Sequence, residues 1–169
     1  MTTIDPYLKM AELFRTVSHG VYVIGVSDGH THNAFTAAWV MQTSFKPLML
    51  ALSVNPEHSS YNLMQSNGMF SINVLSDNQL DLAEHFGQPA SHNKLLSIPW
   101  RCHKTQAPVM DEAMAFFECQ IVSETNSGDH NIVVGSVING ELRKPDAITL
   151  DYRQTGELDQ SSSLYPKSF

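Results

Sequence analysis

The stretch from Asn33 to Leu75 decides the fold: NAFTAAWVMQTSFKPLMLALSVNPEHSSYNLMQSNGMFSINVL. It opens on small and polar residues between Asn33 and Ala38, turns at Lys46-Pro47, and continues as an apolar run from Leu48 to Val54. Small side chains beside strands that form a core leave backbone surface open, which favours a site for a flat ligand. An ordinary β-sheet with polar turns is the alternative interpretation of the same pattern.

Around this stretch, segments rich in β-branched and aromatic residues alternate with turn residues such as Asp28-Gly29, which allow the chain to reverse. Strands are expected at residues 21–26, 33–43, 48–54, 70–75, 115–124, 130–138 and 148–152. Turns are expected at 125–129 and at Asn139-Gly140. Roughly seven short strands with few helices predict a mainly β fold, an antiparallel barrel.

Three short helices are expected, at residues 8–17, 59–66 and 79–86. Helical spacing predicts that the first packs across one end of the barrel, through Leu8, Leu13, Phe14 and Val17. Ser59 and Ser60 are candidate N-cap hydroxyls of the second helix, and Gly68 ends it. Residues 70–75 alternate like a half-buried strand, and residues 87–111 form a proline-rich excursion with a short helix.

Length and composition indicate one domain over residues 1–155, followed by a polar tail at 156–169 that is expected to be partly disordered or draped on a partner subunit. A net charge of −7 with no basic cluster argues against nucleic-acid binding. No apolar run reaches membrane-spanning length, and the N-terminus lacks a signal pattern, so a cytoplasmic protein is expected. Cys102 and Cys119 are interpreted as reduced packing residues, and no metal site is expected.

Common catalytic motifs are absent from the sequence, including G-x-G-x-x-G, G-x-x-x-x-G-K-[ST], G-x-S-x-G and H-E-x-x-H. What remains is a series of hydroxyls and small residues at 36–38, 42–44 and 59–60, together with Gly128-Asp129-His130. Small residues admit the polar edge of a heterocycle, and hydroxyls receive a phosphate. This combination suits a flavin.

Several short motifs follow one another along the chain: N-A-F-T-A-A-W at 33–39, a serine before Lys-Pro, F-S-I-N-V-L at 70–75, H-F-G at 85–87, and G-D-H before I-V-V-G at 128–135. The order of these motifs resembles that of the flavin reductase-like family. The resemblance covers residues 11 to 150. It implies an FMN-binding split β-barrel of six or seven antiparallel strands. It also implies a homodimer with the flavin near the subunit interface, to which the excursion is expected to contribute.

The resemblance assigns His130 a catalytic position facing the flavin and the nicotinamide. The cofactor-binding residues that it implies are Asn33, Thr36, Ala37, Ala38, Trp39, Gln42, Thr43, Ser44, Ser53, Asn55, His58, Ser59 and Ser60. Residues 36–39 would run beside the isoalloxazine, and residues 53–60 would bind phosphate. The alternatives are that Trp39 fills a core or interface, that His130 bonds to backbone, and that Asp129 only shapes a turn.

Three features depart from the family pattern. The phosphate loop carries Glu57 where family members often have lysine or arginine, Trp39 is bulky, and residues 152–169 lack the aromatic-glycine ending of many members. Phosphate binding would then depend on hydroxyls, His58 and backbone donors.

The function implied by the resemblance is an oxidoreductase of the NAD(P)H:flavin reductase type. Hydride would pass from NADH or NADPH through bound FMN, or FAD, to a flavin or another acceptor. A flavin-binding module without turnover, acting as sensor, carrier or electron-transfer partner, is the alternative, and a split barrel that binds haem is a third interpretation. The residues do not choose between NADH and NADPH or between FMN and FAD.

Overall fold

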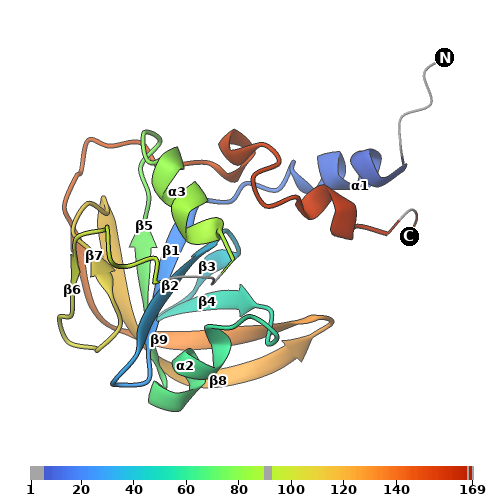
Figure 1. Cartoon of the computed structure of the whole chain (residues 1–169). Helices are drawn as coiled ribbons and strands as arrows, with labels where there is room; N and C mark the ends of the chain where they lie inside the picture. The colour runs from blue at the N-terminus through green and yellow to red at the C-terminus, as the bar shows by residue number, and fades with distance from the viewer. Residues whose placement is uncertain (1–5, 90–92, 167, 169) are drawn as a thin grey trace.

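The computed structural model describes residues 6–89, 93–166 and 168, with side chains from residue 9 onward. Its main body is a seven-stranded antiparallel sheet in the order β2-β1-β5-β8-β9-β4-β3, which confirms the mainly β fold (Figure 1). The strands are β1 (Tyr22–Ser27), β2 (His32–Ala37), β3 (Val40–Phe45), β4 (Leu48–Val54), β5 (Met69–Val74), β8 (Ala115–Ser127) and β9 (His130–Leu142).

The sheet is curved (Figure 1), and its two edge strands, β2 and β3, are neighbours in the chain. Only Ala38 and Trp39 separate them, so one continuous strand over 33–43 is a wrong prediction. The break is a tight local turn in which the amide of Val40 donates to the carbonyl of Ala38 at 3.1 Å, while the amide of Ser53 donates to the carbonyl of Trp39 at 3.0 Å. The barrel is therefore split at this point.

Strand β5 is buried on both faces, which corrects the half-buried prediction for residues 70–75. The side chains of Ser71 and Asn73 are fully buried. The Asn73 amide donates to the carbonyls of Val23 at 2.9 Å and Pro108 at 3.3 Å, and its oxygen accepts from the amide of Met110 at 2.8 Å. The excursion thus covers the face of β5 that alternation assigns to solvent.

The excursion contains a small two-stranded sheet of β6 (Trp100–Arg101) and β7 (Val109–Met110). Within the described part of 87–111, no helix follows α3, contrary to the expected short helix. The prediction of a turn at Asn139-Gly140 is also wrong, because both residues lie inside β9 and pair with β8. These two long strands instead reverse at Gly128, in the left-handed conformation at φ 67°.

Two helices lie against the barrel, α2 (Tyr61–Asn67) and α3 (Leu80–Gly87). Gly68 ends α2 in the left-handed conformation, as predicted. Ser60 stands at the N-cap, as predicted, but its side chain makes no capping bond. Ser60 is fully buried and accepts from the Asn33 amide at 2.9 Å instead.

Helix α1 (Pro6–Phe14) does not pack across the barrel end as predicted. Leu13, Phe14 and Val17 are about half exposed, whereas Met10 and Ala11 are buried. The side chain of Leu8 lies outside the described residues. Helix α1 lies beside the C-terminal 3-10 helix η2 (Ser161–Leu164), and both extend away from the sheet (Figure 1).

The chain after β9 returns to the barrel without forming the strand expected at 148–152. It makes only two isolated bridges, Ser76 with Thr149 and Gly20 with Asp151. The 3-10 helix η1 (Tyr152–Thr155) follows, capped by Asp151, and residues 156–166 then lead through η2. Residues 156–166 are called the C-terminal segment below.

Candidate functional site

A cavity of about 250 Å³, called the first cavity, opens where β2 ends at the split of the barrel. Its lining comes from β2 and the following turn, the end of β4 and the loop after it, the start of β9, and the C-terminal segment. The lining residues are Phe35, Thr36, Ala37, Ala38, Trp39, Ser53, Val54, Asn55, His58, His130, Tyr152, Asp159, Ser161 and Leu164.

Small residues form the inner edge of this cavity. Ala37 and Ala38 are only partly covered, so a ligand can approach their backbone. The neighbouring Thr36 hydroxyl is already used, because it donates to the carbonyl of Ala83 in α3 at 2.6 Å. Thr36 therefore joins β2 to α3, and its hydroxyl keeps only acceptor capacity toward the cavity.

Two rings flank the outer side of the cavity. The centroids of Trp39 and His130 lie 5.0 Å apart at 55°, and Trp39 is 44% exposed. The Nδ1 atom of His130 lies 2.9 Å from the Asp129 carboxylate, whose pKa this bond holds below its ordinary value. In the tautomer in which Nδ1 carries the proton and donates to Asp129, the Nε2 atom of His130 is an acceptor.

The opposite end of the cavity is polar and carries His58. Burial, together with the nearby Lys94 ammonium, lowers the pKa of His58 below its ordinary value. Its Nδ1 accepts from the amide of Ser60 at 3.2 Å, which leaves the proton on Nε2 as a donor. Its ring packs against Phe35 with centroids 4.5 Å apart. This end therefore offers a neutral donor rather than a cation.

Several predicted residues lie away from the first cavity. The partly buried Asn33 and the buried Ser60 are hydrogen-bonded to each other outside the lining, and Ser59 is exposed outside it. Gln42 borders a separate cavity of about 180 Å³, and its amide donates to the carbonyl of Ser44 at 3.3 Å. The break at Ala38-Trp39 resets the alternation of side chains, so residues of β3 no longer face the same side as β2.

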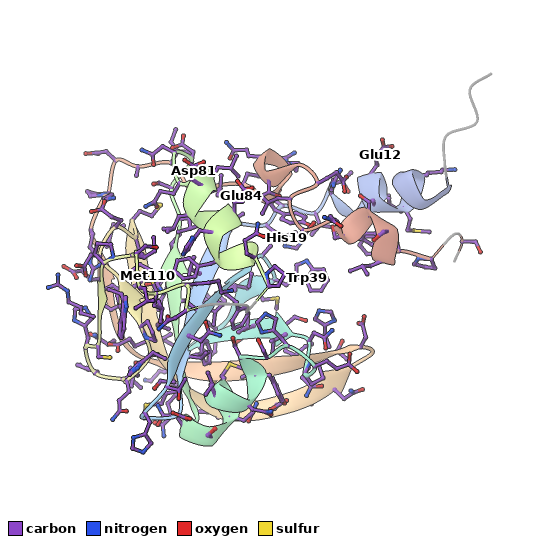
Figure 2. The ribbon with its side chains drawn as sticks, in the orientation of Figure 1. Glu12, His19, Trp39, Asp81, Glu84 and Met110 are labelled. Carbon is purple, nitrogen blue, oxygen red and sulfur yellow. The ribbon has the colours of Figure 1, made fainter. Side chains whose placement is uncertain are left out.

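Thr43 borders a second cavity, of about 380 Å³, on the other side of Trp39. His19 and Trp39, both labelled in Figure 2, line this second cavity together. Trp39 and Ser53 are shared by the two cavities. Trp39 is thus a wall between the two cavities.

The sequence analysis missed the side of the first cavity that the C-terminal segment supplies. Asp159, Ser161 and Leu164 reach it from a polar stretch with no periodic pattern, and Tyr152 reaches it from η1. Burial raises the pKa of Tyr152 to about 12. The missed Phe35 and Val54 are buried neighbours of residues that were predicted.

A family model for the flavin reductase like domain matches residues 14–157, which is most of the chain. The chain belongs to this family. It is 29% identical to diflavin flavoprotein A 1 of Synechocystis sp. over 144 residues, 83% of this chain but 25% of that protein. The chain thus spans about a quarter of the length of the curated relatives it matches.

Solved structures of the same fold agree with this assignment. NADH:FAD oxidoreductase SgcE6 of Streptomyces globisporus is 25% identical, with a TM-score of 0.78 over 88% of this chain and 91% of that one. That protein has also been solved in complex with NAD and FAD fragments. Flavin reductase PheA2, 22% identical with a TM-score of 0.74 over 85% and 92%, shares the fold. The family supports an oxidoreductase that acts on flavin.

Two absences concern the described part of the chain. No group of three or more His, Cys, Asp or Glu side chains is placed there to hold a metal ion. None of its helices has the length and apolar character needed to cross a bilayer.

Proposed function

We propose that the chain binds FMN in the first cavity and catalyses hydride transfer from NADH or NADPH to a flavin or another electron acceptor. FAD is the second candidate cofactor. The observation that carries the proposal is the meeting of Ala37, Ala38, Trp39, His58 and His130 around one cavity at the split of the barrel. These residues come from three separate segments that the family resemblance also selects.

The lining fits a flavin in shape and chemistry. The small edge at Ala37 and Ala38 lets backbone groups reach a ring edge, while Trp39 offers an aromatic face to stack on. When bound, a flavin accepts hydride from a reduced nicotinamide and passes the electrons on. The proposed chemistry requires the protein only to position the two rings and exclude water.

His130 is proposed as the residue that orients the nicotinamide. Its Nδ1 bond to Asp129 fixes the ring, so that Nε2 is left to accept from the amide group of the nicotinamide. His58, with its proton on Nε2, is proposed to receive the flavin phosphate, because Pro56 has no amide hydrogen and the amides of Glu57 and His58 already donate to Asn55. With no lysine or arginine between Asn55 and Ser60, phosphate binding is expected to be weak.

The test is an absorbance spectrum of the protein after saturation with FMN and desalting, followed by anaerobic addition of NADH and then NADPH. Retained flavin that bleaches with either nucleotide supports the proposal. A Trp39→Ala variant should bind FMN about tenfold more weakly, since an aromatic stack contributes about 1.4 kcal/mol. Trp100→Phe, in β6 and outside the lining, is the matched control.

A second candidate is the flavin-binding module without turnover, and the acidic Glu57 in the phosphate loop favours it. Bound flavin that bleaches with dithionite but with neither nucleotide would select this module. A Soret band in the purified protein would instead select the haem interpretation.

We also propose a homodimer whose contact lies on β3 and β4 rather than on the excursion, and exposed apolar residues on these strands support this position. Met41, Phe45 and Leu48 are 64%, 84% and 54% exposed. An edge strand with such side chains needs a cover. Light scattering during gel filtration should give a dimer for the natural chain and a monomer for Phe45→Glu. A cytoplasmic location remains part of the proposal.

A further inference from the structure

The first cavity has one wall that lies largely outside the part of the chain matched by the family model. The match ends at residue 157, whereas Asp159, Ser161 and Leu164 line the cavity from the C-terminal segment. Leu158 also reaches the neighbourhood of the site, since a Cβ built on Gly87 would lie 3.6 Å from its side chain. This wall is therefore a property of this chain's own C-terminal segment.

Polar bonds from Arg15 and a stack of the Phe14 ring on Tyr165, with centroids 5.3 Å apart, join the C-terminal segment to the N-terminal part of the chain. The Arg15 guanidinium donates to the carbonyl of Gly156 at 2.9 Å and to the hydroxyl of Ser162 at 3.5 Å, and it pairs with the carboxylate of Glu157. Glu157 in turn accepts from Ser162 at 2.7 Å. The Arg15 and Glu157 side chains are 26% and 51% exposed, so this latch lies near solvent.

A second set of bonds faces the cavity. The Tyr152 hydroxyl donates to Asp159 at 2.6 Å and lies 3.0 Å from the Ser161 hydroxyl. The amide of Ser161 donates to the other oxygen of Asp159 at 3.0 Å. These bonds shape the segment against η1, and they bind it to no strand of the sheet.

We propose that the C-terminal segment is a lid over the first cavity, with Arg15 as the positioning residue that latches it and sets how fast bound flavin is released. The inference rests on the proposed function. The segment supplies one wall of the cavity, through Asp159, Ser161 and Leu164. The partly exposed ion pair between Arg15 and Glu157 is weak enough to let this wall move.

The experiment measures FMN dissociation from the full-length protein by stopped flow, with released flavin trapped by an excess of a second flavin-binding protein. Arg15→Ala should release FMN at least about threefold faster, in line with the small energy of an exposed pair. Arg153→Ala is the matched control, because Arg153 pairs with Asp151 beside the same segment but does not line the cavity. Its release rate should equal that of the natural chain.

Salt gives a readout that a purely structural role of Arg15 would not produce. The screening length shortens from about 10 Å at 0.1 M to about 3 Å at 1 M, which weakens an exposed ion pair. FMN release from the natural chain should therefore accelerate with salt, and release from Arg15→Ala should change less. A truncation after Thr155, checked for folding by its melting curve, should release FMN at least about tenfold faster.

The outcomes separate the lid from the proposed function. FMN binding with equal release rates and equal salt dependence in the natural chain and Arg15→Ala would overturn the lid alone. Failure of the natural chain to bind FMN would overturn the proposed function and the lid with it. Faster, less salt-dependent release from Arg15→Ala, with Arg153→Ala unchanged, would establish the latch.

Discussion

The excursion and the C-terminal segment both cover the barrel from outside the main sheet, but they are held in different ways. Glu118, fully buried in β8, accepts from the Thr105 amide and hydroxyl, each at 2.7 Å, and from the amides of Lys104 and Asn139 at 3.1 and 2.6 Å. The C-terminal segment is held instead by the partly exposed Arg15 latch, by the stack of Phe14 on Tyr165, and by the bonds of the Tyr152 hydroxyl.

The difference teaches which cover is fixed and which can move. Buried polar groups are costly to separate because each would be left without a partner in a low-dielectric interior. Exposed ion pairs exchange partners with water at little cost. The excursion is therefore expected to open only when the domain unfolds, whereas the C-terminal segment is expected to open locally.

The largest effect is expected for Glu118→Ala. It leaves the buried Thr105 donors and the partly buried amides of Lys104 and Asn139 without an acceptor, so the free energy of unfolding should fall by about 3 kcal/mol. Denaturant unfolding measures it. Glu112→Ala, whose side chain is 70% exposed, is the control and should change stability by less than about 0.5 kcal/mol. Equal effects of the two variants would break the distinction between the covers.

Asn73→Ala is expected to cost about 2 kcal/mol in the same measurement, because the amide of Met110 and the carbonyls of Val23 and Pro108 lose a buried partner. Asn126→Ala, on the exposed end of β8, is the matched control. A loss no larger than that of the control would mean that the excursion is not fastened through β5.

Lowering the pH should affect the global stability of the domain through the excursion but not through the C-terminal segment. Burial opposes the charge of Glu118, but bonds from Asn139 and Thr105 outweigh it and hold its pKa below the ordinary 4.5. The stabilisation is thus complete above pH 4.5 and is lost as the pH falls below it. Bonds from Ser162 and Arg15 also lower the pKa of Glu157. Glu118→Gln should flatten the acid limb of global stability, and Glu157→Gln should leave it unchanged.

The smallest effect on stability is expected for Arg15→Ala. An exposed pair of this kind contributes less than about 1 kcal/mol to the free energy of unfolding. Denaturant unfolding should therefore place this variant close to the natural chain, even though its flavin release is predicted to accelerate. A loss comparable to that of Glu118→Ala would show that the C-terminal segment is part of the global fold rather than a lid.

Sequence reasoning predicts the regular parts of this molecule well, because their signals are local. Strand β4 runs from Leu48 to Val54 as its apolar run indicates, and Gly68 ends α2 as turn chemistry requires. The prediction from alternation fails at β5, because the outer face of this strand is covered by the excursion, whose residues lie far along the chain. The prediction from alternation also fails at Ala38-Trp39, because a break of two residues changes the side of the sheet that the side chains of β3 face.

The sequence likewise predicts only some of the residues that line the first cavity. Family motifs select Ala37, Trp39, His58 and His130, which the fold brings to one cavity, but the neighbouring Gln42 turns away after the break in the strand. The wall made by the C-terminal segment has no local signature, because its polar residues are placed by Arg15 and Tyr152 through contacts between distant parts of the chain.

Hydrogen–deuterium exchange with and without FMN tests the central claim most directly, that flavin occupies the first cavity beneath a lid that moves. Residues 104–110 should exchange slowly in both states. Residues 156–164 should exchange quickly in the free protein and become protected with FMN, together with 36–39 and 53–58. Protection that is absent from both the cavity strands and the C-terminal segment, although FMN is bound, would contradict the account.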